Sequence, residues 1–137
     1  MIRQRIYHAD TDWRCHVYYI VTKPDAREIM ERLSEIGCED ETLRRAYRNL
    51  TSGKLDTGLT YTNKTLRESV VVIAKTSTAL EFLLSLEHEF GHLACHIAQY
   101  YDLPLGGEDV RYICDALIEK TWIISRRLLC DCCRHKH

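Results

Sequence analysis

Hydrophobic and polar positions along this chain of 137 residues change their period several times, and each change predicts a different element. The stretch Trp13–Val21 contains consecutive β-branched and aromatic residues, which favour a strand. In the next two stretches apolar residues recur every three or four positions. They predict one helix from about Pro24 to Ile36, ended by Gly37, and another from about Asp40 to Leu50.

A hairpin is expected next, with strands over about Thr57–Tyr61 and Glu68–Ala74. Both stretches favour the extended backbone, and Asn63 and Lys64 lie in the turn between them. The hairpin therefore lies directly before the first of two long helices.

Two long helices complete the pattern. Thr78 and Glu81 form a capping box, which predicts the start of a helix that ends near Tyr101. Pro104 and the pair Gly106-Gly107 interrupt the chain, and the last helix is expected over about Glu108–Leu129. The predicted order is strand, two helices, two strands and two helices, which defines an α+β fold in a single domain.

Bulk composition narrows the class of protein. An apolar share of 45% and a charged share of 28% are typical of a soluble globular domain. The net charge of −1 predicts no general attraction to nucleic acid or to a membrane surface, and the longest apolar run, Val70–Ala74, is too short to span a bilayer. The first residues lack the apolar stretch of a signal peptide. We therefore expect a cytoplasmic protein, or one of the host cytoplasm if the gene is viral, with its seven cysteines reduced.

The strongest chemical signal is His88-Glu89-Phe90-Gly91-His92, an H-E-x-x-H pattern inside the first long helix. Positions four apart share a helix face, so His88 and His92 can bind one ion. Glu89 can then reach a water molecule at that ion, as in zinc hydrolases. The alternative interpretation is a surface helix with two unrelated histidines.

Catalytic zinc takes a third protein ligand, and the candidates are His96, Glu108 and the C-terminal cysteines. His96 lies eight residues after His88, about 12 Å along a helix, which is too far for both to bind one ion on a continuous helix. Glu108 follows the Pro/Gly break and starts a helix that returns toward the histidines, so it is preferred, with Asp109 as the substitute. Glu108 alternatively serves only as a carboxylate at a helix N-terminus.

These residues resemble the gluzincin group of zinc metallopeptidases, and the chain is also similar to ImmA/IrrE-type peptidases. The resemblance covers roughly residues 57–120. It implies a small zincin-like domain with a catalytic core over 57–129, whereas residues 1–56 stay unassigned. It also implies that His88, His92 and Glu108 bind Zn²⁺, that Glu89 is the catalytic base, and that the edge strand of the hairpin lines the cleft. For the group that steadies the oxyanion our candidate is Tyr112.

The expected function is zinc-dependent hydrolysis of a peptide or protein substrate, with no membrane or nucleic-acid partner. The alternative is a non-catalytic metal-binding protein that acts in regulation or interaction on the same scaffold. The tail, residues 130–137, contains Cys130, Cys132 and Cys133 with two histidines. Three interpretations stay open for it: a frayed reduced end, a second soft-metal site, or a thiolate that caps the zinc position.

Overall fold

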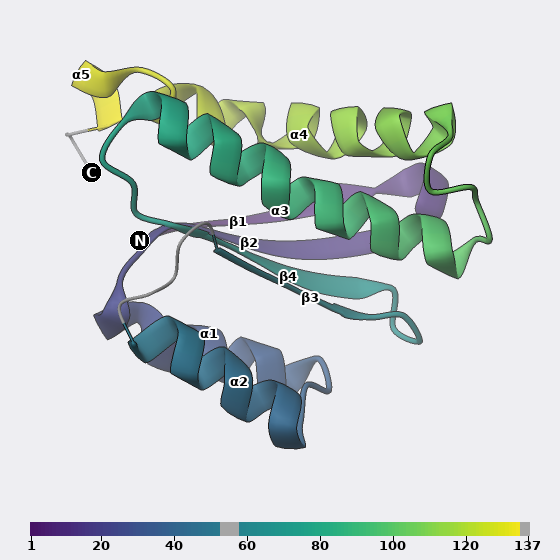
Figure 1. Ribbon diagram of the computed structural model, residues 1–137, viewed down its shortest axis with the longest axis horizontal. Coiled ribbons are helices and arrows are strands. Elements are labelled where there is room, and N and C mark those ends of the chain that lie inside the picture. The colour runs from purple at the N-terminus through teal and green to yellow at the C-terminus, as the bar shows by residue number, and fades with distance from the viewer. Residues whose placement is uncertain (53–57, 135–137) are drawn as a thin grey trace.

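The computed structural model of the chain describes residues 1–52 and 58–134, and the side chains of these except for the last two. It shows a mixed α+β domain with one four-stranded sheet between two layers of helices (Figure 1). The strands are β1 (Ile2–His8), β2 (Trp13–Val21), β3 (Gly58–Asn63) and β4 (Glu68–Ala74). The helices are α1 (Ala26–Glu35), α2 (Asp40–Thr51), α3 (Ala79–Tyr100), α4 (Glu108–Leu128) and the short α5 (Asp131–Arg134), with 3₁₀ turns at Ala9–Thr11 and Lys23–Asp25.

The sheet order is β1-β2-β4-β3. The central pair β2 and β4 is parallel, and each outer strand pairs antiparallel with its inner neighbour. Because a parallel pair needs a long crossover, α1 and α2 lie between β2 and β4 in the chain. Residues 70–74 of β4 are buried, as expected for a strand covered on both faces, which explains their unbroken apolar run.

Strand β1 is the element that sequence analysis did not predict. It pairs with β2 from Ile2–Tyr19 to His8–Trp13, and it places buried Ile6 and His8 toward α4. The observed order therefore begins with two strands rather than one. The other predicted strands and helices are confirmed, with ends that differ by a few residues. Thr57, the expected start of the hairpin, lies outside the described residues.

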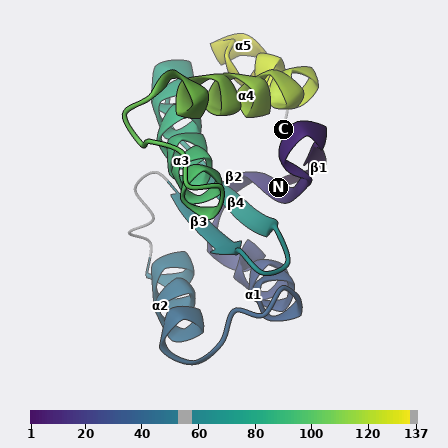
Figure 2. The ribbon, with the colours of Figure 1, turned by 90° about the vertical axis from the view of Figure 1, so that its right-hand side faces the viewer.

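Each face of the sheet has its own apolar core (Figure 2). Helices α3 and α4 cover one face, with α3 over β3 and β4 and with α4 over β1. Helices α1 and α2 cover the other face. A bulge in β2 between Tyr18 and Val21 lets Tyr19 and Ile20 both join the α3–α4 core, and Ile20 adopts a φ of 51° there. Helix α3 thus lies at the β3 edge of the sheet.

The start of α3 is capped twice. The Thr78 hydroxyl accepts the Glu81 N–H at 3.1 Å, as the predicted capping box requires, whereas the Glu81 carboxylate accepts the N–H of Ser77 rather than that of Thr78. From the C-terminal end, Asp131 accepts the Ala79 N–H at 2.8 Å. Residues 131–134 therefore form α5 near the first turn of α3 (Figure 1). None of the described helices is long and apolar enough to cross a membrane.

Candidate metal centre

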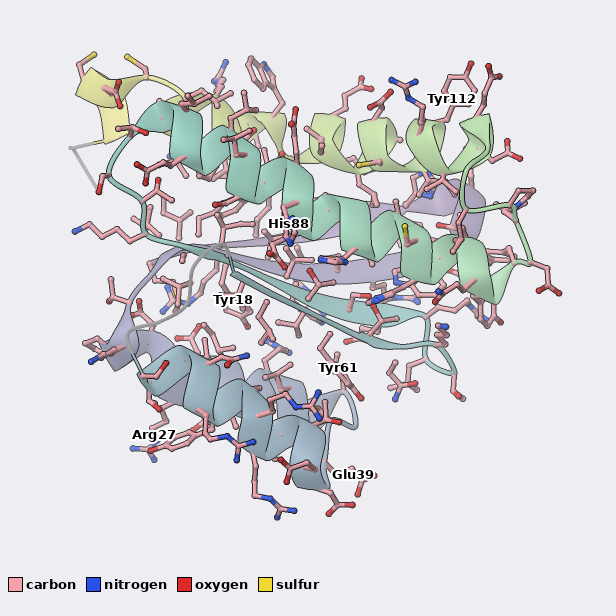
Figure 3. The ribbon with its side chains drawn as sticks, in the orientation of Figure 1. Tyr18, Arg27, Glu39, Tyr61, His88 and Tyr112 are labelled. Carbon is pink, nitrogen blue, oxygen red and sulfur yellow. The ribbon has the colours of Figure 1, made fainter. Side chains whose placement is uncertain are left out.

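The two histidines of the H-E-x-x-H pattern meet on the outside of α3. Their Nε2 atoms lie 3.1 Å apart, and their rings are nearly perpendicular with centroids 4.6 Å apart. Both side chains are exposed, and Figure 3 shows His88 near the middle of α3. The predicted pairing of the two imidazoles on one helix face is therefore present before any ion binds.

This pair has the spacing that a zinc ion requires of two of its ligands. Two imidazole nitrogens on one tetrahedral zinc ion, each at about 2.0–2.1 Å, lie about 3.3 Å apart. The observed 3.1 Å is within reach of that value by small side-chain rotations. His88 and His92 thus fit two protein ligands of a zinc site.

The side chain of Glu89 extends from α3 toward strand β3, and only 3% of the residue is exposed. The Thr60 hydroxyl is 2.9 Å from its carboxylate Oε1 and 3.1 Å from its main-chain oxygen. The other carboxylate oxygen, Oε2, lies 4.0 Å from the Nε2 of His88. The carboxylate is therefore held by the edge strand on one side and reaches the histidine pair on the other.

Gly58 explains how β3 approaches so close to Glu89. Its φ is 156°, and a Cβ at this position would lie 1.8 Å from the main-chain oxygen of Val72 and 3.1 Å from the Cγ of Glu89. Only glycine fits such a backbone at such a distance. Sequence analysis missed the roles of Gly58 and Thr60, although the alternation Gly58, Thr60, Thr62 along the strand marks the face turned toward α3.

The other predicted site residues lie elsewhere. Glu108 and Asp109 are at the start of α4, where Asp109 is exposed, and Tyr112 is 65% exposed on the side of α4 away from His88 (Figure 3). Among the side chains that the structure describes, no group of three His, Cys, Asp or Glu residues is arranged to hold a metal ion. Glu108 and Asp109 are thus not brought to the histidine pair here, and the roles predicted for Glu108 and Tyr112 stay predictions.

His96 occupies the next turn of α3 and faces β3. Its Nδ1 lies 2.8 Å from the hydroxyl of Thr62. Burial lowers the pKa of His96, and the nearby positive charges of Lys64 and of His92 when protonated lower it further. A neutral imidazole is therefore favoured at this position near pH 7.

The cysteines whose side chains are described differ in exposure. Cys15 is buried and Cys114 is half-buried; burial raises the pKa of both thiols, that of Cys114 to about 11. Cys130 and Cys132 are exposed, and their sulfur atoms lie 3.0 Å apart on either side of Asp131. The described segment of the tail thus has two thiols close together at the far end of α3 from His96, and residues 135–137 lie outside the described chain.

No protein-family model, no curated protein and no solved structure matches this chain.

Proposed function

We propose that this protein is a zinc-dependent peptidase with a zincin-like arrangement, in which His88 and His92 bind the ion and Glu89 is the general base. The observation that carries the proposal is the pair of Nε2 atoms 3.1 Å apart, with the Glu89 carboxylate 4.0 Å from one of them. The sequence resemblance to gluzincin and ImmA/IrrE peptidases supports the same assignment. Glu108 is the third ligand that the resemblance implies.

The chemistry divides between the ion and the side chains. When bound, zinc supplies a water molecule of lowered pKa and polarises the carbonyl that the water attacks. Glu89 accepts a proton from the attacking water, whose oxygen bonds to the carbonyl carbon. The carbon–nitrogen bond then breaks, and Glu89 returns the proton to the leaving amine. The hydrogen bond from Thr60 orients the carboxylate for both transfers.

The proposed substrate is an extended peptide. Among the described strands β3 pairs only with β4, so its other edge offers main-chain groups beside the α3 helix. A peptide that adds to this edge as a further strand gains main-chain hydrogen bonds without any particular sequence. A peptide bound in this way lies beside the histidine pair, which supports hydrolysis of a peptide rather than of a small molecule.

The test combines zinc analysis with peptide cleavage. Purified protein is expected to contain about one zinc per chain. It is also expected to cleave oxidised insulin B chain, followed by mass spectrometry. Glu89→Gln should keep the zinc and abolish cleavage, whereas the control Glu87→Gln, an exposed carboxylate two residues earlier on α3, should retain both. Cleavage by the zinc-loaded Glu89→Gln variant would contradict the proposed mechanism.

A second candidate function is a non-catalytic metal-binding regulator. It is favoured by the near-complete burial of Glu89, because a general base must reach a water molecule in an open site. It predicts that the wild-type protein binds zinc, cleaves no peptide and shows no difference from Glu89→Gln in either measurement.

A further inference from the structure

Three histidines follow one another along α3 at a spacing of four residues, and the third differs from the other two. His88 and His92 are exposed and face each other. His96 is half-buried and turns its Nδ1 toward Thr62 on strand β3. His96 therefore differs from the pair in both burial and hydrogen-bond partner, which indicates a separate role.

A chain of hydrogen bonds links His96 to the core. The Trp13 indole N–H donates to the hydroxyl of Ser69 at 3.0 Å. The Ser69 and Thr62 hydroxyl oxygens lie 2.7 Å apart, and Thr62 Oγ1 is 2.8 Å from His96 Nδ1. Ser69 is fully buried, and Trp13 and Thr62 are its only side-chain partners among the described residues.

The direction of this chain follows from counting protons. An indole nitrogen only donates, and each hydroxyl has a single proton. If Ser69 donates to Thr62 and Thr62 donates to His96, every proton has an acceptor. In the opposite direction His96 donates to Thr62 and Thr62 to Ser69, which leaves the buried Ser69 proton without an acceptor. If Ser69 and His96 both donate to Thr62, the Thr62 proton has no acceptor within this chain of bonds, so both arrangements are unfavourable. The favoured direction makes Nδ1 of His96 an acceptor, so the neutral ring has its proton on Nε2.

An imidazole in this tautomer offers no lone pair on Nε2 to a metal ion, but it offers a hydrogen-bond donor. This disfavours His96 as an Nε2 ligand for a reason independent of helix length. It leaves an Nε2–H group one helical turn beyond His92, about 6 Å along the axis.

Strand β3 and helix α3 run in the same direction, because Thr60 contacts Glu89 and Thr62 contacts His96. A peptide on the outer edge of β3 therefore passes along the histidine stripe. Two residues of an extended chain span about 6.6 Å, and carbonyls two residues apart point the same way. Antiparallel pairing, the more stable kind, places residues on the N-terminal side of the scissile carbonyl nearest His96.

We propose, building on the peptidase function above, that His96 is a substrate-positioning residue. Its Nε2–H donates to the main-chain carbonyl two residues before the scissile one. The Trp13–Ser69–Thr62 chain holds the ring in the required tautomer.

The tautomer is tested without any substrate. In ¹⁵N-labelled protein at pH 7.5, long-range ¹H–¹⁵N spectra should show the proton of His96 on Nε2, both before and after addition of Zn²⁺. Thr62→Val should produce a mixture of tautomers, whereas Thr62→Ser should not. A proton on Nδ1 in the wild type, or replacement of the Nε2 proton by zinc, would overturn the proposal. Because this readout does not need activity, it separates failure of the proposal from failure of the peptidase function.

The contact with the peptide is tested with two zinc-anchored probes, acetyl-trialanine hydroxamate and acetyl-alanine hydroxamate. Only the longer probe has a carbonyl two residues before the anchored one. In the zinc-loaded protein His96→Ala should weaken the longer probe about five- to tenfold and the shorter one less than about twofold. The zinc content should not change, and Gln99→Ala on the same helix should bind both probes like wild type. An equal loss for both probes, or loss of zinc, would contradict the assignment.

Discussion

The hydroxyl of Thr60 lies 2.9 Å from the carboxylate of Glu89 and 3.1 Å from the main-chain oxygen of the same residue. One side chain of the edge strand therefore contacts both the carboxylate and the main chain of the residue that we assign as the general base. Because Glu89 is almost entirely buried, this contact matters for stability as well as for orientation.

Thr60→Val should lower the free energy of unfolding by about 1–3 kcal/mol. The variant keeps the shape of the side chain but removes a hydrogen bond to a buried carboxylate. Thr60→Ser retains the hydroxyl and should lose less than half as much. Urea denaturation followed by circular dichroism measures both, and equal stability of Thr60→Val and wild type would show that the bond contributes nothing.

Gly58→Ala should destabilise the protein by at least about 2 kcal/mol. The added methyl group would overlap the main-chain oxygen of Val72 and press on the side chain of Glu89, at a φ that alanine rarely adopts. Gly106→Ala is the matched control, because a Cβ there meets nothing within 4 Å. The control should stay within about 0.5 kcal/mol of wild type in the same urea experiment. Similar losses in both variants would argue against a close approach at Gly58.

Asp131→Ala should cost about 1 kcal/mol, since the carboxylate caps the first turn of α3 by accepting the Ala79 N–H. Asp131→Asn keeps an acceptor but loses the favourable charge at the helix N-terminus, so its loss should be only a few tenths of a kcal/mol. Thermal denaturation of the three proteins checks this order. If Asp131→Ala melts like wild type, the tail does not stabilise α3.

Acidification should weaken folding through His8. Burial, with a contribution from Lys120, lowers the pKa of His8, whereas Asp10 opposes the shift. The unfolded chain therefore binds a proton near pH 6.5 that the folded chain binds only at lower pH, and stability is lost as the pH falls through this window. The free energy of unfolding should decrease between about pH 7.5 and about pH 5.5, and it should decrease less in His8→Gln. Identical slopes in the two proteins would contradict this.

Elements with a strong local signal could be predicted from the sequence. Helix α3 has a capping threonine, a continuous apolar stripe and a Pro/Gly break after its end, so its bounds and the pairing of His88 with His92 follow from local rules. Strand β1 could not be found in this way. Its Ile2–His8 stretch mixes arginine and glutamine with few apolar residues, and it becomes a strand because β2 is available to pair with it.

Contacts between distant segments could not be predicted from the sequence either, because they depend on how separate elements pack. The bond from Thr60 to Glu89 and the cap from Asp131 to Ala79 join residues 29 and 52 positions apart. No periodicity within one element specifies such a pair. The expected approach of Glu108 to the histidines likewise depended on how two helices pack, and the described structure places α4 over β1.

The most direct test of the account is the zinc content of purified protein, measured by inductively coupled plasma mass spectrometry. We predict about one zinc per chain in the wild type and none in the variant with both His88→Ala and His92→Ala. A variant with Cys130→Ser and Cys132→Ser should keep its zinc, which excludes binding by these exposed thiols. A wild-type protein that stays free of zinc after incubation with Zn²⁺, or a double-histidine variant that retains the metal, would contradict the assignment of this site.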